Sequence, residues 1–239
     1  MASGLRGHDV LILSEVFDDR ARECLIGRLA LDYPYSTSFV EPFAPWLDDG
    51  GLLVLSKWPI RREARRSIGA DGPRMDCLAS IGVVYAELET PSGHVHIFGC
   101  FAHAVGAAGS SYARREQFRA LRAFVDEQGV PRSEPLLVAG DANVDMSSES
   151  EARLALLSAV GARFEPPHAG EAYTYDPETN RLARGQGRAL RDYVLISSSH
   201  RQPASLGTAV MPLRTDRPWW KNVRDLSDHH GLWARLIYD

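Results

Sequence analysis

Short apolar runs of strand length recur along the chain, and this pattern constrains the fold more than any other feature of the sequence. Polar, glycine or proline residues bound the runs, as is typical of strands in a well-buried sheet. The expected strands are 9–16, 51–56, 79–88, 94–101, 135–140, 192–198, 205–210 and 230–238. A chain of this kind must assemble a large buried sheet.

Helical segments separate several of these runs. Residues 18–31 and 112–128 place apolar side chains at helical spacing. A third helix is expected over 149–160, where Ser148 and Glu151 have the spacing of a capping box. Strands that alternate with helices and are followed by further strands indicate an α/β protein with mixed strand pairing.

The composition is that of an ordinary globular chain, with 44% hydrophobic and 24% charged residues. No repeat or linker divides the 239 residues, so one domain over 1–239 is expected. A net charge of −4 argues against nucleic acid as a partner held by a wide basic surface. Residues 1–8 contain no apolar segment of signal-peptide type, and no apolar run reaches the roughly 18 to 20 residues of a spanning helix.

Polar side chains recur where the expected strands end. They are Glu15, His103, Asp141, Asn143, Asp192, Asp228 and His229. Loops at the ends of rigid strands commonly carry catalytic groups. Hard oxygen ligands favour Mg²⁺, and two histidines remain for acid–base and electrostatic work. This set suits hydrolysis of a phosphodiester, which requires charge neutralisation, a positioned water and a proton acceptor.

Six segments share their order with the landmarks of one family. They are DVLILSEVFD, GGLLVLSKWPI, VAGDANV, YTYDPETN, DYVLIS and SDHHG. The chain thereby resembles the bacterial neutral sphingomyelinases of the endonuclease/exonuclease/phosphatase superfamily, and the common order makes the match specific although each motif is weak alone. The resemblance implies a DNase-I-like four-layer α/β sandwich, in which two mixed β-sheets pack together and helices flank them.

The resemblance also implies a reaction and roles for individual residues. Water would attack sphingomyelin in line and release ceramide and phosphocholine, with Mg²⁺, or Mn²⁺ or Co²⁺ in its place, as the cofactor. Glu15 resembles the principal metal ligand, and His229 resembles the general base. Asp141 and Asn143 resemble the pair that orients the water and contacts the phosphate, and Asp228 matches the aspartate that precedes the base.

Two further roles follow from the resemblance. His103 matches a histidine that stabilises the transition state, and Asp192 matches the aspartate that pairs with it. Trp219 and Trp220 lie where relatives have an exposed hairpin that docks on a peripheral membrane surface. A packed aromatic cluster is an equally open interpretation of the two tryptophans.

The sequence also departs from the family pattern. The expected strand 9–16 leaves no room for the first family strand or its asparagine metal ligand, and Ala102 stands where the family has threonine beside His103. Three interpretations therefore stay open: a sphingomyelin phosphodiesterase, another metal-dependent phosphodiesterase, phosphatase or nuclease, or a catalytically impaired lipid-binding relative. The family implies secretion, which this amino terminus does not predict. The oligomeric state cannot be predicted.

Overall fold

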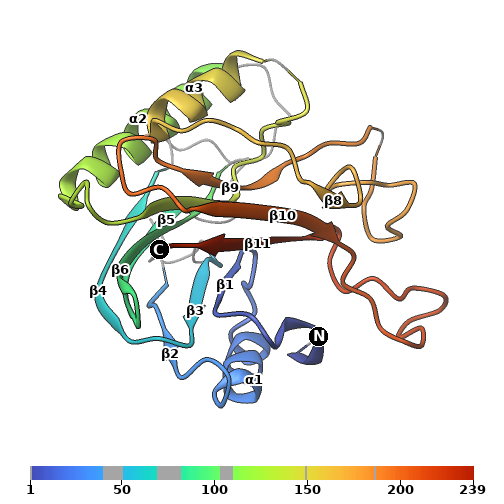
Figure 1. The fold of residues 1–239 in the computed structure, drawn as a ribbon. Helices are drawn as coiled ribbons and strands as arrows, with labels where there is room; N and C mark the ends of the chain where they lie inside the picture. The colour runs from blue at the N-terminus through green and yellow to red at the C-terminus, as the bar shows by residue number, and fades with distance from the viewer. Residues whose placement is uncertain (1, 40–50, 69–81, 103–109, 149, 186) are drawn as a thin grey trace.

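The computed structural model describes residues 2–39, 51–68, 82–102, 110–148, 150–185 and 187–239 (Figure 1). Its helices are η1 (Ala2–Leu5), α1 (Asp19–Leu29), α2 (Ser110–Glu127) and α3 (Glu151–Val160). Its strands are β1 (Val10–Leu13), β2 (Tyr35–Ser36), β3 (Leu53–Ser56), β4 (Ile60–Ser67), β5 (Gly82–Thr90), β6 (Gly93–Phe101), β7 (Leu136–Asp141), β8 (Ala169–Gly170), β9 (Asp192–Ile196), β10 (Ser205–Met211) and β11 (Gly231–Ile237). No described helix combines the length and the apolar character needed to cross a bilayer.

A five-stranded mixed sheet forms the centre of the fold, in the order β4-β5-β6-β7-β9. Only β6 and β7 run parallel, and the other neighbours are antiparallel. Alternate residues of β5 face opposite sides, as the pleat requires. Val83 and Tyr85 join the cluster that contains Phe118 and Leu121 of α2, whereas Val84 and Ala86 join a cluster on the other face.

The second β-layer packs on that other face. It consists of the antiparallel sheet β1-β3-β2 and the mixed sheet β11-β10-β8. Leu52 and Val54 pack against the central sheet, while Leu53 and Leu55 pack with Leu29 of α1. The order of layers is therefore helices α2 and α3, central sheet, second β-layer and α1 (Figure 1). The four-layer α/β architecture expected from the sequence is confirmed, with the second layer divided into two three-stranded sheets.

The strand β4 was not predicted from the sequence. Its residues read IRREARRS, a charged run expected to be a solvated surface segment. The strand forms the edge of the central sheet and pairs with β5. Arg62 is 3.5 Å from Glu87 and Arg66 is 2.9 Å from Glu127. Charged side chains on an edge strand prevent pairing with other chains, so a hydrophobic pattern is absent here although a strand is present.

The start of α3 also differs from the expectation. Ser150 caps this helix, and its side-chain oxygen accepts from the backbone N–H of Arg153 at 3.2 Å. Ser148, the predicted cap, instead donates its hydroxyl to the carbonyl of Asp145 at 3.2 Å. The predicted capping box from Ser148 to Glu151 is therefore wrong, because a serine two residues closer to the helix takes its place.

Candidate active site

The carboxyl end of β7 carries two of the predicted residues. Gly140 has a φ of 130°, and a Cβ added to it would collide with the carbonyl oxygen of Cys100, so this approach of β7 to β6 requires glycine. The buried carboxylate of Asp141 accepts from the backbone N–H of Asn143 at 2.6 Å. Asn143 has a φ of 52°, and its amide donates to the carbonyl of Ala102 at 3.0 Å. This left-handed turn fixes both side chains at the end of the sheet.

A histidine–carboxylate hydrogen bond lies beside this turn. Asp192, the first residue of β9, is in register with Asp141 on β7. Its Oδ2 lies 2.7 Å from Nδ1 of His229, and Oδ2 of Asp141 lies 4.0 Å from the same nitrogen. The structure thus pairs Asp192 with His229, which the sequence analysis did not predict. The predicted partner, His103, lies outside the described residues.

Glu15 and Asp228 complete the group of acidic side chains. Glu15 follows β1 and has a φ of 60°, and the backbone N–H of the next residue, Val16, donates to the carbonyl of Gly51 at 2.9 Å. Partial burial of the Glu15 carboxylate, although the residue as a whole is exposed, raises its pKa, and the charge of Asp228 raises it further. Chain segments far apart in the sequence therefore converge on one site.

The electrostatics of this site are those of crowded negative charge. Burial, followed by the charge of Asp192, raises the pKa of Asp141 to about 8. Burial lowers the pKa of His229, but its hydrogen bond to Asp192 and the charges of Asp192, Asp141 and Asp228 outweigh this effect and raise the pKa to about 9. Several carboxylates thus surround a single imidazole, and further positive charge in the site would favour the ionised form of all of them.

The donor set fits a divalent cation. Asp141, Asp192 and His229 offer ligand atoms that all lie within 4.8 Å of one another. Glu15 and Asp228 add oxygen donors whose charges act on the same group. Carboxylate oxygens are the ligands that Mg²⁺ prefers in proteins. A cation would offset the burial and the mutual repulsion that raise the pKa values of Glu15 and Asp141.

The adjacent histidines have different environments. His229 faces the carboxylates with 18% of its side chain exposed, while His230 is buried. Nε2 of His230 lies 3.1 Å from the hydroxyl of Thr179, and burial lowers its pKa. His230 is therefore held within the protein and away from the acidic group.

Sequence reasoning missed a residue that borders the site. The ring of Tyr175 meets the ring of His229 edge-on, with centroids 5.3 Å apart, and the two residues form an isolated β-bridge. The guanidinium of Arg191 lies over the Tyr175 ring, 4.0 Å from its centroid. Tyr175 lies in the motif YTYDPETN, which carried the family resemblance but gave no chemical signal for a role of its own.

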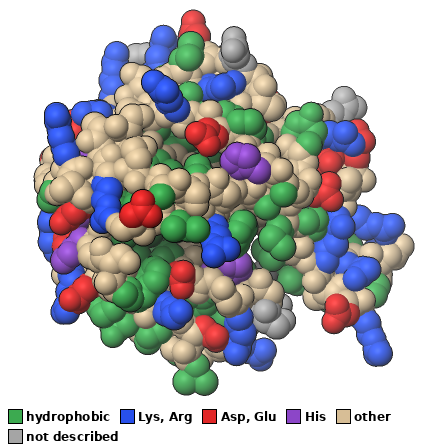
Figure 2. All heavy atoms as spheres, viewed as in Figure 1, with side chains coloured by type: hydrophobic (Ala, Val, Ile, Leu, Met, Phe, Trp, Pro, Cys, Tyr) green, Lys and Arg blue, Asp and Glu red, His purple; other side chains and the backbone are tan. Residues whose placement is uncertain are grey.

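The two predicted membrane residues lie on a projecting hairpin between β10 and β11 (Figure 1). Bridges from Arg214 to Asp225 and from Trp220 to Val223 close the hairpin. Trp219 and Trp220 are 54% and 53% exposed, so they do not form a packed aromatic cluster inside the protein. Basic side chains gather on the same projection (Figure 2).

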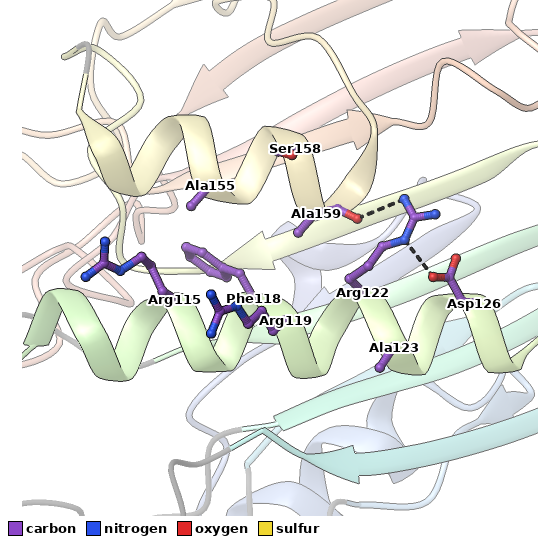
Figure 3. Close-up of a pocket in the computed structure, with 9 residues that line it drawn as sticks. All are labelled: Arg115, Phe118, Arg119, Arg122, Ala123, Asp126, Ala155, Ser158 and Ala159. Carbon is purple, nitrogen blue, oxygen red and sulfur yellow. Dashed lines mark hydrogen bonds and ion pairs between the residues drawn. The ribbon is translucent and has the colours of Figure 1, made fainter.

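A groove on the helical layer is separate from this site (Figure 3). It has a volume of about 590 Å³ and is lined by Arg115, Phe118, Arg119, Arg122, Ala123, Asp126, Ala155, Ser158 and Ala159. Arg122 crosses it, donating to Asp126 at 2.7 Å and to the carbonyl of Ala159 at 3.5 Å. None of the predicted site residues that the structure describes lines this groove.

Comparisons with known proteins agree with this geometry. The model of the Endonuclease/Exonuclease/phosphatase family matches residues 2–229. Sphingomyelinase C 2 of Leptospira interrogans is 29% identical over 98% of the chain, although the match spans only 41% of that relative's length. The crystal structure of sphingomyelinase C from Streptomyces griseocarneus is 31% identical, with a TM-score of 0.82 over 95% of this chain and 86% of that one. A magnesium-bound beta toxin from Staphylococcus aureus, 24% identical, shares the fold with a TM-score of 0.86 over 97% of this chain and 88% of that one.

The chain belongs to the endonuclease/exonuclease/phosphatase family. Within that family its relatives in sequence and structure include bacterial sphingomyelinases C. The resemblance inferred from the ordered motifs is thereby confirmed.

Proposed function

We propose that the chain is a Mg²⁺-dependent phosphodiesterase that hydrolyses sphingomyelin to ceramide and phosphocholine. The observation that carries the proposal is the Asp192–His229 hydrogen bond of 2.7 Å within a group of carboxylates at the strand ends. A base and a cation-binding group side by side are what phosphodiester hydrolysis requires. The similarity to sphingomyelinases C supports the choice of substrate.

Glu15 is proposed as the principal cation ligand, with Asp228 and Asp141 close by. When bound, Mg²⁺ supplies positive charge that balances the phosphate and the departing oxygen. The acidic group of this chain suits that ion, because the carboxylates already repel one another in its absence. Mn²⁺ and Co²⁺ accept similar oxygen ligands and are expected to substitute for it.

His229 is proposed as the general base. Its Nδ1 is engaged by Asp192, so the carboxylate holds the tautomer in which Nδ1 carries the proton and Nε2 is available as the acceptor. The imidazole then takes the proton of a water that attacks phosphorus in line. The neighbouring carboxylates raise the pKa of His229 to about 9, and positive charge in the site would lower it towards neutrality, where a general base works best.

The remaining predicted residues are proposed to position the attacking water and to stabilise the transition state. Asn143, held by its bond to the carbonyl of Ala102, and Asp141 would orient the water and contact the phosphate. His103 keeps its proposed role in stabilising the transition state. The three contiguous hydrophobic clusters that join the four layers support one catalytic domain over 1–239.

Release of phosphocholine tests the proposed reaction. The protein is incubated with vesicles of sphingomyelin, with vesicles of phosphatidylcholine and with DNA, each in Mg²⁺ and in chelator. We expect release from sphingomyelin in Mg²⁺ alone, its loss in chelator, and its loss in Glu15→Ala and His229→Ala. His168→Ala, which alters an exposed histidine, is the matched control and keeps full activity. Hydrolysis of DNA or phosphatidylcholine without that of sphingomyelin contradicts the substrate, and no hydrolysis of any of them contradicts the reaction.

We also propose that the hairpin carrying Trp219 and Trp220 binds the surface of the substrate membrane. The support is the exposure of both indoles beside Lys221, whose ammonium lies 4.8 Å from the Trp220 ring. Indole rings favour the lipid interface, and basic side chains favour anionic lipid. We expect Trp219→Ala/Trp220→Ala to lose most binding in vesicle sedimentation while its circular dichroism is unchanged. Equal sedimentation of a folded double variant rules out this role.

A further inference from the structure

The motif YTYDPETN forms a partly buried segment between β8 and β9, and no function has so far been assigned to it. Two polar residues of this segment are almost completely enclosed, with exposed fractions of 0% for Thr174 and 1% for Asn180. Enclosed polar groups persist only where their hydrogen bonds are satisfied. The partners of these groups therefore show what the segment holds in place.

Thr174 binds the backbone next to both members of the catalytic pair. Its hydroxyl oxygen accepts from the backbone N–H groups of Arg191 at 3.0 Å and of Asp192 at 3.2 Å. Its carbonyl accepts from the backbone N–H of His230 at 2.7 Å, one residue beyond His229. A single fully buried residue thus connects the two segments whose side chains meet in the 2.7 Å bond between Asp192 and His229.

The position of β9 explains why such a connection is needed. This strand lies at the edge of the central sheet, with β7 on one side. The first N–H groups of an edge strand have no partner strand on the open side and fray unless something else binds them. At Asp192 the hydroxyl oxygen of Thr174 binds such an N–H group. A small displacement of the backbone there would move the Asp192 carboxylate away from His229.

The same segment also holds the loop that carries His229. The side-chain amide of Asn180 donates to the carbonyl of Ser227 at 2.9 Å, and the ring of Tyr175 borders the ring of His229. Tyr175 in turn pairs through its backbone N–H and carbonyl with Ala189 at 3.0 Å each, just before β9. Several residues of the segment therefore contact either the loop that carries His229 or the chain just before Asp192.

We propose that Thr174 is a positioning residue that sets the geometry of the Asp192–His229 pair through its hydroxyl and its carbonyl. This role rests on the proposed function, since it acts only through that pair. Thr174 itself is fully buried, so it offers no exposed surface to a substrate. Thr174→Val keeps the shape and the backbone carbonyl but removes the acceptor for the two amides, whereas Thr174→Ser keeps that acceptor.

Kinetics on sphingomyelin vesicles provide the first test. We expect Thr174→Val to lower kcat about 10- to 100-fold with little change in KM, as lost hydrogen bonds behind reacting groups do, and Thr174→Ser to restore most of it. Thr37→Val is the matched control, because Thr37 is also buried and its hydroxyl accepts from the backbone N–H of Val54 at 3.1 Å, within another sheet. This control leaves kcat unchanged.

A double variant separates positioning from a general loss of stability. If Thr174 acts through Asp192, Thr174→Val lowers kcat in the native background and adds no further loss to Asp192→Asn. Independent losses that multiply in the double variant overturn the proposal. An equal fall of kcat in Thr37→Val overturns it as well, because the effect would then be structural.

Two readouts need neither turnover nor cation, so they separate this proposal from the proposed function. The Nδ1–H proton of His229, assigned by its absence in His229→Ala, is expected far downfield in the NMR spectrum of the native protein and of Thr174→Ser. It is expected to move upfield or disappear in Thr174→Val. Amide exchange of the native protein decides the question if Thr174→Val fails to fold. Protection of the Arg191, Asp192 and His230 amides supports the proposal, and rapid exchange at Asp192 overturns it.

Discussion

Two histidine–carboxylate pairs lie in different parts of the molecule. Near the beginning of β6, Nε2 of His96 lies 2.6 Å from a carboxylate oxygen of Glu134. At the ends of β7 and β9, Nδ1 of His229 lies 2.7 Å from a carboxylate oxygen of Asp192. The two hydrogen bonds have nearly the same length and chemistry, so the surroundings must decide what each pair can do.

The two pairs differ in whether the second ring nitrogen of the histidine has a hydrogen-bond partner. Nδ1 of His96 is bound to the hydroxyl of Tyr85 at 2.8 Å, the two rings stack with centroids 5.9 Å apart, and His96 is 2% exposed. Both nitrogens of His96 are thus engaged. His229 is open to the solvent side, and within the described part of the chain its Nε2 has no hydrogen-bond partner. A histidine–carboxylate pair can act as a base only where one nitrogen is available to a water.

Replacement of each carboxylate by its amide tests this difference, and Asp192→Asn has the largest expected effect. The amide no longer fixes the tautomer of His229 that leaves Nε2 as the acceptor, so kcat on sphingomyelin is expected to fall about 10²- to 10⁴-fold. Steady-state release of phosphocholine measures it. A variant with native kcat would show that the pair is not the base.

The corresponding change at the other pair, Glu134→Gln, is expected to affect stability instead. Loss of the carboxylate weakens a hydrogen bond to a buried ring, which costs about 1–3 kcal/mol in the free energy of unfolding. Denaturant titration measures that cost. The kcat per folded molecule should equal that of the native protein, and a fall of kcat similar to that of Asp192→Asn would contradict the distinction between the pairs.

The sequence predicted the layers of the fold better than its edges. Apolar runs located most of the strands of both β-layers, because burial on both faces requires continuous apolar sequence. The edge strand β4 escaped prediction, because its exposed arginines pair with glutamates and leave no apolar pattern. The short strands β2 and β8 carry too few residues for any pattern.

The site shows a similar division. Residue types and strand ends selected Glu15, Asp141 and His229 as candidates, and the structure brings these side chains close enough for their charges to act on one another. The partner of Asp192 could not be predicted, since it depends on β9 lying beside β7 and on the loop before β11 folding over both. Thr174 gave no chemical signal, because it acts through backbone bonds that exist only in the folded chain.

Asp141→Asn is expected to have the smallest effect on stability, and that effect is a gain in the cation-free protein, although the variant also loses a residue of the proposed catalytic site. Because the pKa of Asp141 is raised from 3.8 to about 8, the folded state binds more protons than the unfolded state between those values. The stability of the cation-free protein therefore falls as pH rises from about 4 to about 8. The amide cannot ionise, so the variant avoids that loss and still accepts from the N–H of Asn143.

Thermal unfolding in chelator measures this difference at several pH values. At pH 8 we expect the melting temperature of Asp141→Asn to exceed that of the native protein by about 2–4 °C for each kcal/mol that ionisation of Asp141 costs. At pH 4 we expect the two melting temperatures to be equal. Asp126→Asn, on the exposed face of α2, is the control and shows no such divergence. A constant difference across this range would mean that Asp141 ionises normally. At the His96–Glu134 pair the removal of a charge is expected to lower stability instead, so the gain in stability should be confined to the site at the ends of β7 and β9. Because a cation that binds only the folded protein stabilises it, the proposed function predicts that saturating Mg²⁺ reverses the order of the two melting temperatures.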